Sequence, residues 1–400
     1  RDPAFVEESR KELDYQTKRL RNHASIAVFC GSNENHWIYQ QEWSQSYDPE
    51  YFGGGTIYNH LAPEIMASNC PHIPYWNSSP YGGDVPNSTQ VGNRHHWHEA
   101  MMNPEMEKRI TPEFYDGVGS RFVTEYGYIG PCSMRTIERY HGDAPIERGS
   151  NVWEWHNNTF EKETVVAGIK KHYLDPDALS LDDYLLYAGL CQALMLGYSL
   201  EALRYTKVTN GALFWMYADC WGEVGWTIVD YYLDRKPAYY AVKRAFAPRR
   251  LILRREGQKL GVMLANDTAD ECKIPVQIGY LSFDGSTRDL QTVTLSADAF
   301  SRSWSELDCD MDRGTGADAD GLIVAIPEAD AILPGILRPT EFRNLRLPTP
   351  AIDLSVEQID ACSARVAVCS DSYMHAVHFE LPDGAMTEDD YFDLLPGERR

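Results

Sequence analysis

Short apolar runs alternate with helix-like stretches over roughly the first 250 residues. Runs this short are typical of strands buried on both faces, and they lie at residues 25–30, 72–76, 121–126 and 211–217. Between them, the spacing of apolar residues predicts helices at 58–68, 181–204 and 236–246. A charged helical segment, 5–20, comes first, with Phe5, Leu13 and Leu20 toward one side. Alternating strands and helices predict a parallel α/β sheet or barrel.

The pattern changes after Pro248. Short alternating segments separated by turn residues predict an antiparallel β-sandwich, with strands at 251–254, 260–264, 273–278, 292–295 and 322–326. The proline-punctuated stretch 333–350 resembles a linker, and a second alternating set begins at 352. The sequence therefore predicts an α/β domain at 1–248, a β-sandwich at 249–345 and the start of a second, truncated sandwich at 346–400.

The net charge and the composition indicate which classes of binding partner to expect. The 37 basic and 59 acidic residues give a net charge of −22, which disfavours nucleic-acid phosphate and anionic lipid surfaces, so we expect no nucleic-acid or membrane partner. Aromatic residues make up 12% of the chain and suit either a core or stacking on sugar rings. The nine cysteines have no CxxC spacing, which predicts buried free thiols. No apolar run reaches 18 residues.

Two carboxylates follow apolar runs and are candidates for catalysis. Glu34 comes after the run at 25–30, and Glu125 lies near the end of the run at 121–126. They are 125 − 34 = 91 residues apart, about three strand–helix units of a barrel that uses about 30 residues per unit. Two such groups can point into one barrel mouth, as the two-carboxylate hydrolysis of glycosides requires.

Several segments together resemble glycoside hydrolase family 2, and within it the β-mannosidase branch. Residues 19–34 resemble the acid/base signature, and 121–127 resemble the nucleophile motif, in which Ser usually stands at the position of Thr124. Other segments are similar to the fifth, sixth and eighth strand ends and to a motif of the C-terminal sandwich: 75–83, 93–98, 211–221 and 391–398. Phe29 and Ser32 depart from the family, which commonly has Trp and often Asn there.

The resemblance implies a partial (β/α)8 TIM barrel, strands four to eight, followed by immunoglobulin-like β-sandwich modules. The first three barrel strands and the N-terminal domains of the family are then absent. We expect residues 1–400 alone to show little activity, because the remaining strands cannot close a barrel. The chain opens on Arg1, so no cellular location is predicted.

The implied activity is removal of terminal β-D-mannose from a β-mannoside oligosaccharide or glycan by double displacement. Glu125 is the expected nucleophile and Glu34 the acid, then base, with the pKa of Glu34 raised by burial and by the neighbouring charge. The resemblance assigns substrate binding to residues around these carboxyls: Asn33 at the sugar 2-hydroxyl, Trp215 as a stacking floor, and Trp76, His96 and Trp97.

We expect no cofactor and no metal. His96 and His98 stand two apart, but no carboxylate or cysteine completes a ligand set at recognisable spacing. Two alternatives stay open. One keeps the mechanism and changes the sugar, giving an exo-acting β-galactosidase, β-glucuronidase or β-glucosaminidase. The other is a non-catalytic carbohydrate-binding fragment.

Overall fold

The computed structural model describes residues 2–43, 48, 52–313, 316, 319–329, 331–382 and 384–400. The chain forms two compact units. The first unit comprises residues 1–98, 117–126 and 206–214, and the second comprises 99–116, 127–205 and 215–400.

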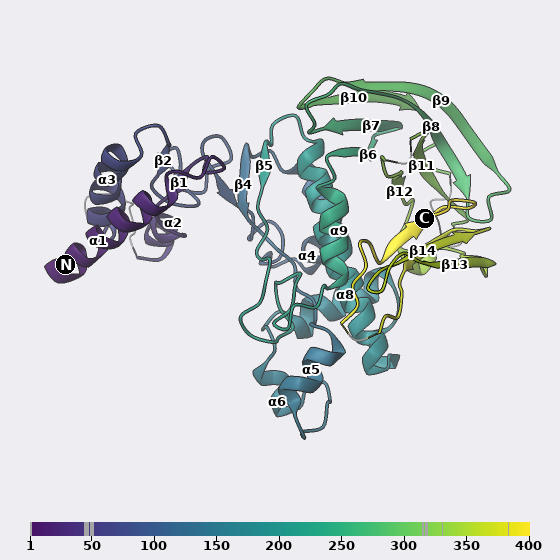
Figure 1. The fold of residues 1–400 in the computed structure, drawn as a ribbon, viewed down its shortest axis with the longest axis horizontal. Helices are drawn as coiled ribbons and strands as arrows, with labels where there is room; N and C mark the ends of the chain where they lie inside the picture. The colour runs from purple at the N-terminus through teal and green to yellow at the C-terminus, as the bar shows by residue number, and fades with distance from the viewer. Residues whose placement is uncertain are drawn as a thin grey trace. The chain divides into compact units, whose positions relative to one another are not determined.

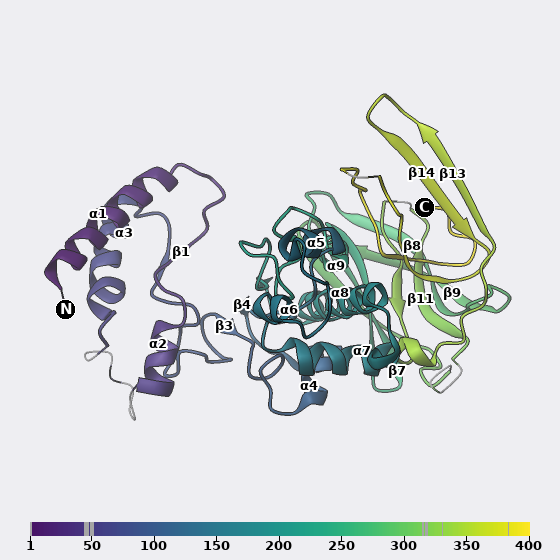
Figure 2. The same ribbon diagram turned by 90° about the horizontal axis from the view of Figure 1, so that it is seen from below.

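The first unit combines helices with very short strands. Its elements are α1 (Pro3–Leu20), β1 (Phe29–Cys30), α2 (Asn35–Ile38), α3 (Ala62–Asn69), β2 (Tyr75–Trp76), β3 (Arg94–His95), β4 (Phe122–Glu125) and β5 (Gly211–Ala212). Helix α1 begins where the Asp2 side chain accepts from the amide of Ala4, and it lies beside α3 (Figure 2). Phe5 is exposed, and the buried residue of α1 is Thr17, so the predicted apolar side of this helix is only partly covered.

The strands of the first unit are parallel, as the sequence predicts. Strand β1 pairs with β2, and β3, β4 and β5 form a second sheet in that order. The expectation of strands buried on both faces is wrong for most of them: Val123 in β4 is fully buried, but Cys30 is exposed. Sheets of two or three strands leave flanks that no neighbouring strand covers, and this explains the exposure.

The second unit contains the remaining α-helices. These are α4 (Met106–Ile110), α5 (Met134–His141), α6 (Asn151–Trp155), α7 (Val166–His172), α8 (Leu181–Tyr205) and α9 (Pro237–Ala245). Helices α8 and α9 confirm the predicted helices at 181–204 and 236–246, and they lie side by side (Figure 1). Residues on several sides of α8 are buried.

Two antiparallel sheets follow and enclose an apolar core. One contains β6 (Arg249–Glu256), β7 (Lys259–Asn266) and β10 (Ser301–Asp308); the other contains β8 (Cys272–Ser282), β9 (Arg288–Ala297), β11 (Gly321–Pro327) and β12 (Gly335–Leu337). Alternate residues point into the space between the sheets, for example Leu251 and Leu253 facing Val276 and Ile278. All five predicted strands are confirmed. Strand β10 was not predicted, because it is mostly polar.

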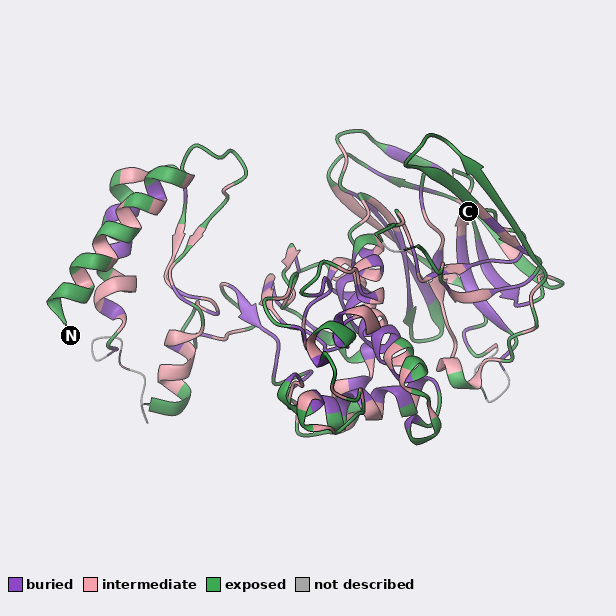
Figure 3. Cartoon of the chain, turned by 60° about the horizontal axis from the view of Figure 1, so that its bottom comes forward, coloured by how far each residue is buried: buried purple, intermediate pink, exposed green. Residues whose placement is uncertain are grey.

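The last strands form two hairpins, β13 (Ile352–Gln358) with β14 (Ala364–Ser370) and β15 (Met374–Val377) with β16 (Phe392–Leu394). Strand β13 is exposed along its whole length (Figure 3). All nine cysteines are free thiols, as predicted, but Cys30, Cys220 and Cys362 are exposed rather than buried. None of the described helices combines the length and the apolar character that a membrane span requires.

Candidate active site

Three ionisable side chains meet at the ends of parallel strands in the first unit. Glu34 follows β1, His95 ends β3 and Glu125 ends β4, where His95 and Glu125 are partners in the β-ladder. The side chains of Glu34, His95 and Glu125 are 21%, 3% and 14% exposed. The two carboxyls can thus be reached from solvent, whereas the imidazole between them is enclosed.

The imidazole bridges the two carboxyls. Nδ1 of His95 lies 2.8 Å from Oε1 of Glu34 and 3.7 Å from Oε1 of Glu125. An oxygen of each carboxyl and the ring nitrogen all lie within 4.8 Å of one another. Trp97 donates its indole N–H to Oε1 of Glu125 at 3.0 Å. The structure therefore brings together Glu34, Glu125 and Trp97 of the predicted site, with His95 among them.

The backbone at Glu34 is unusual. Its φ is +60°, in the left-handed region that non-glycine residues rarely adopt. The amide of Glu34 donates to the carbonyl of Ser79 at 2.6 Å, and the amide of Ser79 donates to the carbonyl of Ser32 at 2.8 Å. Such a conformation costs on the order of 1–3 kcal/mol and is found most often at functional sites, where the surroundings impose it.

Burial raises the pKa of Glu125 above its usual value. The electrostatic interaction with His95 and the hydrogen bond from Trp97 act in the opposite direction, and the neighbouring Glu34 adds a smaller upward effect. The hydrogen bond from Trp97 therefore favours the ionised form of Glu125 in a largely buried position.

The remaining predicted site residues have other surroundings. Asn33 is exposed beside Glu34. Trp76 donates its indole N–H to the carbonyl of Tyr81 at 2.9 Å. His96 is buried and contacts Glu125 through its main chain, its amide donating to the Glu125 carbonyl at 2.8 Å. Trp215 belongs to the second unit, where its side chain is 43% exposed.

The sequence argument missed His95 and chose His96. The contact of His96 with Glu125 is made by its main chain. His95 and Trp97 stand two apart, as residues on one side of an extended segment do, and both contact Glu125 through their side chains. That parity was a usable signal once Trp97 had been selected. Ser79 was also missed, and no local pattern marks it.

The cluster of Glu34, His95 and Glu125 offers three atoms of kinds that bind metal ions. The distances fit hydrogen bonding better. Two ligands about 2.1 Å from a tetrahedral zinc ion are about 3.4 Å apart, whereas Nδ1 of His95 and Oε1 of Glu34 are 2.8 Å apart. A cation would have to separate this pair.

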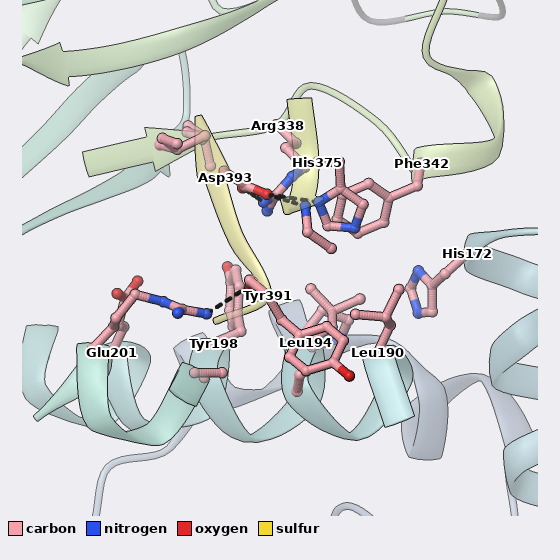
Figure 4. Close-up of a pocket in the computed structure, with 18 of the residues that line it drawn as sticks. His172, Leu190, Leu194, Tyr198, Glu201, Arg338, Phe342, His375, Tyr391 and Asp393 are labelled. Carbon is pink, nitrogen blue, oxygen red and sulfur yellow. Dashed lines mark hydrogen bonds and ion pairs between the residues drawn. The ribbon is translucent and has the colours of Figure 1, made fainter. Parts of the chain in front are cut away.

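A cavity of about 410 Å³ lies in the second unit between α8 and the sandwich (Figure 4). Many of its charged side chains pair with one another. Arg338 and His375 both contact Asp393, and Arg250 lies 2.7 Å from Glu201. Arg338 and His375 hold the pKa of Asp393 well below its usual range. These pairs join the helices to the sandwich, and we assign them a structural role.

Comparison with solved structures shows which fold the chain has. An exo-chitosanase from Amycolatopsis orientalis superimposes with a TM-score of 0.71 and 16% identity, over 100% of this chain and 51% of its own. At that identity the likeness shows the fold alone, the fold of glycoside hydrolase family 2 with its β-sandwich strands.

More specific likenesses are to β-mannosidases. The β-D-mannosidase from Dictyoglomus thermophilum matches with a TM-score of 0.87 and 30% identity, over 100% of this chain and 48% of its own. β-Mannosidase B from Emericella nidulans is 32% identical over 269 residues, 64% of this chain and 31% of that protein. The one from Aspergillus terreus is 25% identical over 100% of this chain and 50% of that protein.

No protein-family model matches the chain. The chain spans about a third to a half of the length of these curated relatives. In sequence and in structure it is β-mannosidase-like and similar to proteins of glycoside hydrolase family 2.

Proposed function

We propose that this chain carries the catalytic carboxylates of a retaining β-mannosidase. The observation that supports this most is the cluster at the strand ends: oxygens of Glu34 and Glu125 within 4.8 Å of each other, with His95 Nδ1 in contact with Glu34. Retaining glycosidases have carboxyls about 5–5.5 Å apart, and inverting enzymes about 6.5–9.5 Å, to leave room for a water molecule. The short separation favours direct attack by a carboxylate.

In the proposed reaction Glu125 attacks the anomeric carbon while Glu34 protonates the departing oxygen. Glu34 then removes a proton from water, which releases the sugar from Glu125 with its configuration retained. The hydrogen bond from Trp97 orients the attacking carboxylate and helps to keep it ionised. The Glu125 side chain is only 14% exposed, which reduces the amount of water that solvates the nucleophile.

The sugar contacts are also proposals. Asn33 is adjacent to the acid in sequence and exposed, which suits a hydrogen bond to the sugar 2-hydroxyl. Trp97 and the main chain of His96 contact Glu125, and Trp76 is part of β2, the neighbour of β1. We assign Trp215 to a stacking floor on the resemblance alone.

We further propose that β1 to β5 are barrel strands four to eight. They are parallel, and their neighbours follow chain order within each sheet. A backbone bridge between Asn33 and Ser79 extends the β1–β2 pairing toward the cluster. The proposed domains are the C-terminal part of a barrel at 1–248, an immunoglobulin-like sandwich at 249–345 and the beginning of another sandwich at 346–400.

The proposed substrate is a terminal β-D-mannoside of an oligosaccharide or glycan, because the relatives most similar in sequence and structure are named β-mannosidases. The test is hydrolysis of a panel of nitrophenyl β-glycosides by the protein at its native length. We expect the highest kcat/KM on the mannoside, and its loss in Glu125→Ala. A higher kcat/KM on the galactoside, glucuronide or glucosaminide would reject the assignment of the sugar, and no turnover of any of them would reject the enzyme.

A further inference from the structure

His95 is part of a chain of hydrogen bonds that runs away from Glu34. Its Nε2 lies 2.8 Å from Oγ of Ser79, and that oxygen lies 2.8 Å from Oγ1 of Thr124. The Thr124 hydroxyl in turn donates to the main-chain carbonyl of Arg94 at 3.3 Å. The chain ends on a group that can only accept a hydrogen bond.

This end favours one direction for the chain of hydrogen bonds. Each hydroxyl has one proton. When Thr124 donates to the Arg94 carbonyl, its oxygen accepts the Ser79 proton, and the Ser79 oxygen accepts a proton from Nε2 of His95. His95 then carries hydrogen at Nε2, and Nδ1 is left to share a proton with Glu34.

We propose that Ser79 and Thr124 are positioning residues that select the Nε2–H form of His95 and thereby keep the working proton on the contact between Nδ1 and Glu34. The proposal deepens the function proposed above and rests on it. In this arrangement a neutral Glu34 donates its O–H to Nδ1, and when the leaving oxygen takes that proton the Glu34 carboxylate faces an unprotonated Nδ1. The contact becomes favourable again when Glu34 takes a proton from water in the second step.

The opposite tautomer would weaken the acid. With hydrogen at Nδ1, neutral His95 donates to the Glu34 carboxylate and stabilises the ionised form, which cannot protonate a leaving group. The charged groups that contact the His95 ring are Glu34, after β1, and Glu125, on β4. Neither contacts Nε2, so the selection falls to Ser79 and, through it, Thr124.

The local backbone supports a positioning role. Ser79 binds the acid segment directly, since its amide donates to Ser32 and its carbonyl accepts from Glu34. The same residue therefore places the Glu34 main chain and orients the imidazole that contacts the Glu34 side chain.

The experiment compares Ser79→Ala and Thr124→Val with the conservative Thr124→Ser in the protein at its native length. We expect kcat on an alkyl β-mannoside to fall about five- to tenfold in the first two variants, the value of one neutral hydrogen bond. On a dinitrophenyl β-mannoside kcat should change less than twofold, and KM should stay unchanged on both. The alkaline limb of the pH profile should move to lower pH, and Thr124→Ser should restore the wild-type values.

Equal losses on both substrates, or the same loss in a Glu34→Ala background, would overturn the proposal, because the effect would then not pass through the acid. A second readout is independent of activity. Histidine ¹⁵N shifts should show the Nε2–H form of His95 in the wild type and the Nδ1–H form in Ser79→Ala. The Nδ1–H form in the wild type would refute the proposal even if the enzyme is a β-mannosidase. Absence of turnover with the expected shifts would reject only the proposed function.

Discussion

Replacing Glu34 by alanine should slow the enzyme by an amount that depends on the leaving group. The Glu34 side chain is 21% exposed and has one oxygen 2.8 Å from His95, so a variant has no equivalent proton donor at that point. General acid catalysis contributes about 10²–10⁴-fold, or about 2.7–5.4 kcal/mol of barrier. A dinitrophenolate leaves without protonation, so its release does not depend on general acid catalysis by Glu34.

The assay is kcat/KM for an alkyl β-mannoside and a dinitrophenyl β-mannoside, measured on the wild type, Glu34→Ala and a control. Glu42→Ala is a matched control, since Glu42 is an exposed glutamate close to Glu34 in the chain. We expect a loss of about 10²–10⁴-fold on the alkyl substrate, less than tenfold on the dinitrophenyl substrate, and no loss in the control. Equal losses on the two substrates would refute the role of Glu34 as acid.

Three further predictions concern stability and metal. Because burial raises the pKa of Glu125 above its ordinary value of 4.5, its contribution to stability is fully present below that pH and is lost as pH rises through the raised pKa. Glu125→Gln should therefore be inactive yet gain in Tm relative to the wild type as pH rises from 4 to 8, and a constant difference would contradict this. Because Glu34 has φ +60°, the free energy of unfolding in urea should be about 1 kcal/mol higher for Glu34→Gly than for Glu34→Ala. The converse control is Gly257→Ala, because Gly257 has φ +65° and no neighbouring atom crowds a Cβ there; this variant should lose about the same free energy of unfolding. Dialysis against a chelator should leave kcat unchanged, because the 2.8 Å contact of His95 with Glu34 leaves no room for a cation between them; activity lost and then restored by a divalent ion would show a metal site.

Long periodic segments were the part of the fold that could be predicted from the sequence. The 25-residue helix α8 is long and rich in apolar residues, and the sandwich strands β6 to β9 and β11 place alternate apolar residues in one core, so both patterns are visible locally. Strand β10 was missed, because its alternation is mostly of polar residues. The strands β1, β2 and β5 are much shorter than the apolar runs that predicted them, and no apolar run predicted β3, since pairing between strands, rather than the run itself, decides where a strand lies.

The site also has one part that could be predicted from the sequence and another that could not. The two carboxyls could be predicted, because each follows an apolar run and parallel strands end at one edge. The role of His95 depends on a contact with Glu34 across 61 positions of the chain, and that of Ser79 on contacts with both neighbouring segments. No local pattern contains such contacts. Only the side shared by His95 and Trp97 indicated which of the two adjacent histidines would face the carboxyls.

The central claim is that Glu125 forms a covalent bond to the sugar. A 2-deoxy-2-fluoro mannoside with a good leaving group should accumulate this intermediate, because the fluorine slows its hydrolysis more than its formation. Proteolysis and mass spectrometry of the labelled protein should then place one fluoromannosyl group on Glu125. A label on another residue, or an unlabelled enzyme that releases product of inverted configuration from the unmodified substrate, would contradict the account.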